Sequence, residues 1–179
     1  MKRFFITLTI TMLALTIQAQ NDVTTFMDVP VDGKASSVLS QLKEKGCKKV
    51  GHKTLETTLN DKAYKVNVLA SKKGVYQVRL TQSRGTESLQ KGIDNYNELI
   101  KWFRADNSYT EYEKNNFISN KDDATHLQNI YDKWYYAEFF QKSNGEKENY
   151  DKVVSFYLTD EDGCYKLVVC FVNRNNELN

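Results

Sequence analysis

The chain has 179 residues, of which 40% are hydrophobic and 12% aromatic, and it carries 25 basic and 23 acidic side chains. This length fits one domain or two small fused repeats, and the apolar content is sufficient for a core, so a mostly disordered chain is excluded. Basic and acidic residues are mixed along the sequence, apart from short pairs such as Lys48-Lys49 and Lys72-Lys73. Because nucleic-acid binding draws its affinity from clustered Lys and Arg, we expect no nucleic-acid partner.

The first residues have the three parts of a secretory signal peptide. A basic pair at 2–3 precedes an apolar run at 4–17, and Ala19 offers a small residue at a cleavage point. We therefore predict a signal peptide over 1–19, with a mature chain that begins at Gln20 and is exported to the periplasm or the extracellular space. The alternative is a buried N-terminal helix. Since the apolar run is shorter than the about 20 residues of a membrane-spanning helix, we expect no membrane span after cleavage.

The first half of the mature chain predicts one helix followed by strands. Apolar residues at helical spacing over 35–42 predict an amphipathic helix, with Asp32 as its N-cap and Gly46 as its stop. Beyond Gly46 the apolar residues alternate with polar ones, which is typical of half-buried strands joined in a hairpin. These strands are predicted at 64–69 and 76–80, with weaker ones within 48–59.

The second half follows a similar order. A single apolar stripe predicts a long helix between residues 86 and 105. The polar stretch 106–123 is predicted to be loop with a short strand, and 124–131 a brief helix. Further strands are predicted at 134–141, 153–158 and 164–172.

Two segments resemble each other within the chain. Residues 74–80 and 163–169 both have the pattern Gly-x-Tyr-x-apolar-x-apolar, 89 positions apart. We therefore predict an α+β fold of tandem helix-plus-antiparallel-strand repeats, with the helices packed on one face of the sheet. The first repeat is expected over 20–82 and the second over 83–179, together in one compact unit. Chance similarity between two strands that follow Gly turns is the alternative.

The opening of the mature chain carries a resemblance. Phe26 is followed by Val29-Pro30-Val31-Asp32-Gly33, a short helix and Lys45-Gly46. This resembles the opening of small secreted proteins of uncharacterised function from gut-type Gram-negative bacteria. The order of elements is also similar to that of the beta-lactamase inhibitor proteins, whose tandem halves form a concave binding surface. That similarity implies a binding role and transfers no individual residue.

The chain has three cysteines, Cys47, Cys164 and Cys170. An exported protein can form a disulfide, which leaves one thiol unpaired. Cys164 and Cys170 lie in one predicted strand, about 20 Å apart if extended, and this is too far for a bridge. A disulfide would therefore join Cys47 to Cys164 or Cys170. The alternative is that all three are small buried hydrophobes.

No motif for catalysis or metal binding stands out. His52 and His126 have no second ligand at helical or strand spacing, and the acidic residues before Gly163 are explained by a hairpin turn. A thiol of Cys164 or Cys170 with His126 as base is conceivable, but both cysteines lie in an apolar strand. We expect no catalytic residue, no metal and no cofactor.

Aromatic residues are concentrated in the second half, and the predicted strand 134–141 carries them on both faces. One face must be core, while the other is either an exposed platform or covered by a helix. The candidate binding surface consists of Tyr109, Tyr112, Trp134 and Tyr136.

Three functions remain open. The first is a secreted non-enzymatic binding module that recognises an unknown protein and acts like an inhibitor. The second is a carbohydrate-contacting accessory protein that binds a glycan. The third is a small hydrolase whose site the sequence hides.

Overall fold

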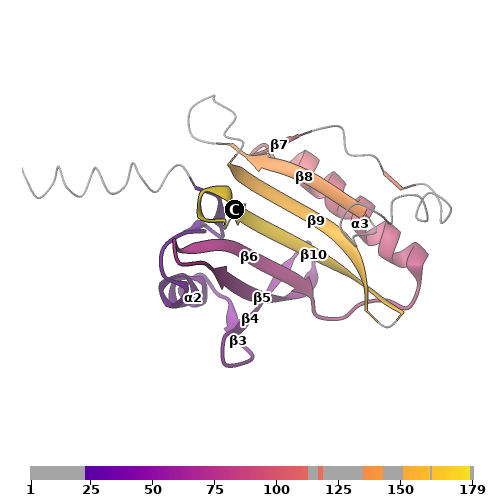
Figure 1. Ribbon diagram of the computed structural model, residues 1–179. Helices are drawn as coiled ribbons and strands as arrows, with labels where there is room; N and C mark the ends of the chain where they lie inside the picture. Colours follow the sequence, from indigo (N-terminus) through magenta and orange to yellow (C-terminus); the bar gives the residue numbers. More distant parts are fainter. Residues whose placement is uncertain (1–22, 113–116, 119–134, 143–150, 162, 178–179) are drawn as a thin grey trace, which may run out of the picture.

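The computed structural model describes residues 23–112, 117–118, 135–142, 151–161 and 163–177 (Figure 1). The predicted signal peptide, the predicted brief helix at 124–131, Trp134 and His126 lie outside these residues. The strands of the large sheet are β3 (Lys48–Lys49), β4 (Thr54–Leu59), β5 (Lys62–Ala70), β6 (Val75–Gln82), β7 (Tyr109–Glu111), β8 (Tyr135–Gln141), β9 (Lys152–Glu161) and β10 (Cys164–Asn173). The remaining elements are the hairpin strands β1 (Thr25–Phe26) and β2 (Val29–Pro30), the helices α2 (Ala35–Glu44) and α3 (Leu89–Ala105), and the 3-10 turn η1 (Arg174–Asn176).

The predicted architecture of two tandem repeats is wrong. The structure is mostly one continuous antiparallel sheet of eight strands, in the order β3-β4-β5-β6-β10-β9-β8-β7. At its centre β6 pairs directly with β10, so that Val78 lies opposite Phe171 and Leu80 opposite Val169. The shared sequence pattern has a local cause, because Gly74 and Gly163 both have positive φ angles, 140° and 76°, in the turns that precede these two strands.

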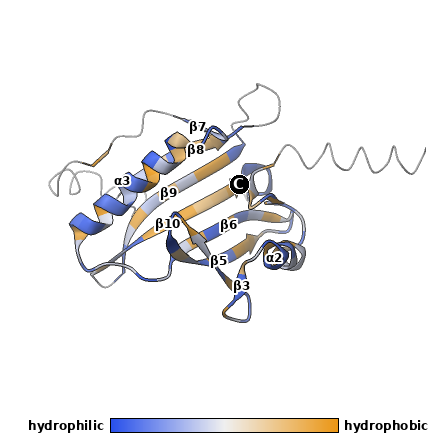
Figure 2. Ribbon diagram, turned by 180° about the vertical axis from the view of Figure 1, so that it is seen from behind, coloured by the Kyte–Doolittle hydropathy of each residue, from blue (hydrophilic) through white to orange (hydrophobic). Residues whose placement is uncertain are grey.

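The helices α2 and α3 both pack on one face of this sheet and enclose the main core with it. In Figure 1, β8 and β9 pass in front of α3, and Figure 2 shows α3 from the other side, above hydrophobic parts of β9 and β10. The predicted stripe of α3 is confirmed as buried, and Phe103 stacks on Phe139 and Phe156 with ring centroids 5.2 and 5.4 Å apart. The buried residues of the stripe are Ile93, Tyr96, Leu99, Ile100 and Phe103, and Leu89 at its start is half-buried. On the same side of the sheet, Phe26 of β1 packs on Phe171 of β10 at 4.8 Å.

The first helix begins later than predicted. Its N-cap is Lys34, whose side chain makes no capping hydrogen bond, and Asp32 accepts hydrogen bonds from the Gly33 amide and from Asn176 instead. The predicted stop is confirmed, because Gly46 has a φ of 106° directly after the C-cap residue, a conformation that glycine adopts without strain.

Three segments far apart in sequence are joined at one end of the sheet. Asn176 Nδ2 donates to Asp32 Oδ1 at 2.7 Å and to the Val75 carbonyl at 2.9 Å, and Ser71 Oγ donates to the Asn176 carbonyl at 2.9 Å. These bonds hold η1 against the β5–β6 turn and the segment that leads into α2. Arg174, the first residue of η1, therefore belongs to a turn that is held against the first half of the chain.

The described part of the chain contains no helix that is both long and apolar enough to cross a membrane.

Candidate binding face

The sheet has a second face, opposite α2 and α3, which we call the open face. On it, side chains of β6, β8, β9 and β10 alternate with those of the main core. A second, smaller apolar cluster lies there, formed by Phe140, Val153, Val168, Cys170 and Val172, with Tyr157 packed against it. The five residues are each at most 9% exposed, so the cluster itself is buried, and the name open face means only that neither of the two described helices packs on this side of the sheet.

The structure separates the predicted surface aromatics. Tyr112 and Tyr136 are 54% and 44% exposed, and the Tyr112 ring meets Phe140 of the open face edge-on at 5.1 Å. Tyr109 packs instead on Phe103 of α3 at 4.8 Å, because alternation along β7 turns it toward the helices. Trp134 lies outside the described residues. Only Tyr112 and Tyr136 of the predicted set are therefore placed on the open face.

A hollow of about 250 Å³ lies on the open face, between the strands and η1. Its polar lining residues are Gln77, Arg79, Tyr136, Ser155, Tyr157, Arg174 and Glu177, and its apolar ones are Val153, Cys170 and Val172. It therefore combines two guanidinium groups, a carboxylate, three hydroxyl groups and one amide with a smaller apolar wall, so that polar groups predominate in its lining.

One ion pair spans the rim of this hollow. Arg174 Nη2 lies 2.8 Å from Glu138 Oε1, and the other carboxylate oxygen of Glu138 accepts a hydrogen bond from the Tyr136 hydroxyl. Burial raises the pKa of Tyr136, and the adjacent Glu138 carboxylate raises it further, against the opposing effects of Ser155 and Arg174. Tyr136 therefore remains a neutral hydrogen-bonding phenol at physiological pH.

Gln77 and Arg79 were not predicted as site residues. They are two positions apart on β6, opposite Val172 and Cys170 of β10. The alternation of β6 places them on the face opposite Val78 and Leu80, and this much can be read from the sequence. Gln77 and Arg79 line the hollow only because β6 pairs with β10. No local sequence pattern predicts that pairing.

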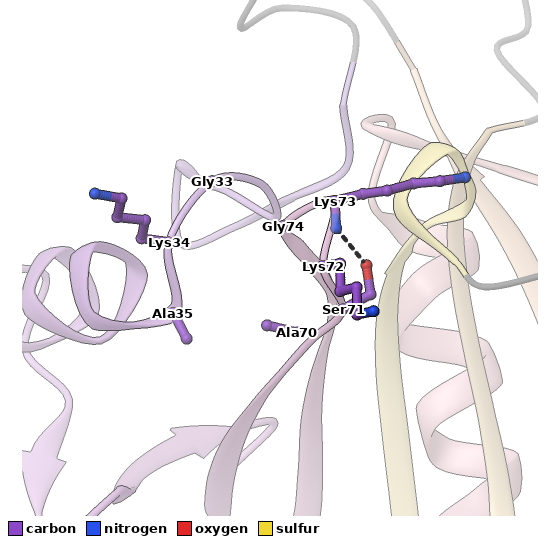
Figure 3. Close-up of a pocket in the computed structure, with 8 residues that line it drawn as sticks. All are labelled: Gly33, Lys34, Ala35, Ala70, Ser71, Lys72, Lys73 and Gly74. Atoms are coloured by element: carbon purple, nitrogen blue, oxygen red, sulfur yellow. Dashed lines mark hydrogen bonds between the residues drawn. The ribbon is translucent and has the colours of Figure 1, made fainter.

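A second hollow, of about 350 Å³, lies between the start of α2 and the β5–β6 turn, where Lys34, Lys72 and Lys73 line it. In Figure 3 these three side chains point in different directions, and the Lys73 amide donates to Ser71 Oγ within the turn. Because their amines do not converge, this hollow does not form an anion site.

All three cysteines are free thiols in the structure, so no disulfide joins Cys47 to Cys164 or Cys170. Cys47 belongs to the main core, where its sulfur lies 3.6 Å from Met27 Sδ and where burial raises its pKa. Cys170 belongs to the cluster on the open face, and Cys164 is half-buried at the start of β10. The sheet lies between Cys47 and Cys170, and this geometry prevents a bridge between them.

Within the described residues, no group of three or more His, Cys, Asp or Glu side chains is arranged to hold a metal ion. The conceivable pairing of a thiol with His126 involves a residue outside the described part. Comparisons of the chain with protein-family models, with curated proteins and with solved structures find no match.

Proposed function

We propose that this protein is an exported, non-enzymatic binding module that engages a protein partner through the open face. The observation that carries the proposal is the pair of exposed tyrosines on a strand-built surface, of which Tyr136 lines a polar hollow and Tyr112 packs on Phe140 of the same face. Tyrosine and arginine are the residues that most often supply binding energy at the centre of protein interfaces. Export is proposed from the signal-peptide pattern over 1–19.

The rigidity of the open face supports this role. Tyr112 rests edge-on against Phe140, and Tyr136 is bonded to Glu138, which is itself paired with Arg174. Side chains held in this way lose little conformational entropy when a partner binds, which favours affinity.

The protonation states favour binding over covalent chemistry. Each resolved pKa shift among the described residues is upward and belongs to a tyrosine or to Cys47, with burial as the first cause. A raised pKa keeps a phenol or thiol neutral, whereas a nucleophilic thiol needs a lowered one. Neutral phenols on a surface are hydrogen-bonding contact groups.

Site-specific photo-crosslinking tests the proposal. A photoreactive amino acid is placed at Tyr112 or Tyr136 in the exported protein and, as a matched control, at the exposed Gln90 on α3. We expect a discrete protein adduct from positions 112 and 136 that excess unlabelled protein suppresses, and no such adduct from position 90. Equal labelling from both faces, labelling of glycan only, or no adduct at all would contradict the proposal.

Cell fractionation tests the export. We expect the mature form in the periplasm or the medium, with an N-terminus at Gln20 by mass spectrometry. A full-length chain retained in the cytoplasm would overturn this part of the proposal.

A further inference from the structure

Two polar side chains stand side by side in the hollow of the open face. Gln77 and Arg79 lie on the same side of β6, and the spacing of alternate strand residues puts their Cα atoms about 7 Å apart. The Gln77 residue is only 7% exposed.

Both groups lack hydrogen-bond partners in the described part of the protein. The Arg79 Nε atom is buried and bonded to none of the described residues, and Arg79 takes part in none of their ion pairs. None of the hydrogen bonds among these residues involves the Gln77 amide. The Arg79 Nε atom is therefore a buried donor left unsatisfied, which costs free energy that a ligand with acceptor atoms recovers.

The other charges near the hollow are already balanced or lie at its rim. Arg174 is paired with Glu138, and Glu138 also accepts from Tyr136. Glu177 lines the hollow, is exposed, and forms no ion pair with the described residues. Arg79 and Glu177 thus both line the hollow, and neither forms an ion pair with the described residues.

We propose that the hollow binds a single carboxylate, held by the guanidinium of Arg79 and the amide of Gln77. The planar fork of a guanidinium matches the two oxygens of a carboxylate, and a Gln amide supplies a further donor. A doubly charged phosphate is disfavoured relative to a singly charged carboxylate, because the carboxylates of Glu138 and Glu177 lie close by and repel the larger charge more strongly.

The walls define the rest of the ligand. Val153 and Val172 offer apolar contact, and the ring of Tyr136 lies at the edge of the hollow. At about 250 Å³ the hollow is smaller than the roughly 300–1,000 Å³ of pockets for drug-sized molecules. It suits a small organic acid or one acidic side chain of a partner, and in the second case the inference rests on the proposed function and names the partner's contact group.

Nuclear magnetic resonance of the exported protein tests this directly, with benzoate as the anionic probe and benzamide as its neutral match. The Nε–Hε signal of Arg79, assigned by its loss in Arg79→Gln, should shift saturably with benzoate and remain unmoved with benzamide. The affinity for benzoate should fall at least tenfold in Arg79→Gln. It should fall less in Arg79→Lys, which keeps the positive charge and loses the planar guanidinium group. Arg84→Gln, outside the hollow, should bind as the parent does, and thermal unfolding verifies that each variant is folded.

Two further arms identify the source of the carboxylate. A short peptide with one Glu, compared with its Gln counterpart, should compete with benzoate if the natural ligand is an acidic side chain, whereas competition by small acids alone indicates a free metabolite. Equal shifts with benzoate and benzamide, tighter binding of inorganic phosphate, or unchanged binding in Arg79→Gln would overturn the inference. Crosslinks from Tyr112 and Tyr136 that persist in Arg79→Gln and resist benzoate would leave the proposed function standing while removing the carboxylate site.

Discussion

Arg174 and Glu138 form an ion pair, with 2.8 Å between Nη2 and Oε1, that joins the C-terminal turn η1 to strand β8 across the open face. The Glu138 side chain is only 12% exposed, and its second carboxylate oxygen accepts a hydrogen bond from the Tyr136 hydroxyl. One half-hidden carboxylate therefore orients both a cation at the rim of the hollow and an aromatic ring of the proposed contact surface.

Substituting Glu138→Gln should lower the pKa of Tyr136. The carboxylate disfavours a neighbouring phenolate, so its removal eases ionisation, while burial, the larger cause of the shift, keeps the pKa above its ordinary value. A titration followed by the ring-carbon resonance of labelled tyrosine, assigned through Tyr136→Phe, measures the change. Lys65→Gln, on a strand away from the pair, is the control, and a Tyr136 pKa that stays at its parental position would contradict this assignment.

The stability of the fold should decline at alkaline pH through Tyr109. Burial, with the Asp106 charge adding to it, raises the pKa of Tyr109 to about 12, whereas an unfolded tyrosine ionises near pH 10. The neutral folded phenol is therefore favoured fully below pH 10, and its contribution is lost as the pH rises from about 10 to about 12. Urea unfolding at several pH values should show a shallower loss over this range for Tyr109→Phe. Tyr112→Phe, which removes an exposed phenol, should keep the parental slope.

Tyr64→Phe should stabilise the protein. The Tyr64 side chain is fully buried in the main core, and its hydroxyl has no hydrogen-bond partner there. Removing an unsatisfied buried hydroxyl recovers its desolvation cost, which is about 1 kcal/mol or more in the free energy of unfolding. Tyr76→Phe, at a half-buried position on β6, is the control and should change that free energy by less than about 0.5 kcal/mol. A destabilised Tyr64→Phe variant would show that the hydroxyl has a partner after all.

Local patterns predicted the elements of this fold well and their assembly poorly. Helical periodicity identified the buried side of α3 at Ile93 and Phe103, and alternation identified β5 and β6. The repeat prediction failed because a Gly turn followed by an aromatic residue arises wherever a strand starts in this way. The candidate site depends on long-range pairing, since Gln77 and Arg79 become a site only when β10 lies beside them. Tyr109 was grouped with Tyr112 because the polar stretch 106–123 has no apolar alternation that would reveal which of the two faces the helices.

Gly85→Ala should be strongly destabilising. A Cβ atom at Gly85 would lie 2.5 Å from Cys164 Sγ and 2.7 Å from the Tyr165 carbonyl oxygen, which is backbone and cannot turn aside. The adjacent Thr86 and Tyr165 exchange two backbone hydrogen bonds, of 2.9 and 2.7 Å, that a shift would break. We expect a loss of about 2 kcal/mol or more in denaturant unfolding. Gly51→Ala is the matched control, because its Cβ would meet Thr54 at an ordinary 3.4 Å, and its stability should stay near the parental value.

Asp61→Gly should stabilise the β4–β5 hairpin. Leu59 pairs with Lys62, which leaves Asn60 and Asp61 as a two-residue turn with φ angles of 45° and 57°. Both central residues of such a turn need positive φ, and glycine adopts it without the steric cost that a Cβ atom imposes. The gain should be about 0.5–1 kcal/mol, or about 2 °C in the midpoint of thermal unfolding. Lys72→Gly in the β5–β6 turn is the control: Lys72 has no positive φ to relieve, so added chain entropy in the unfolded state should lower its stability by a similar amount. Two variants that shift in the same direction would show that backbone strain at Asp61 is not the cause.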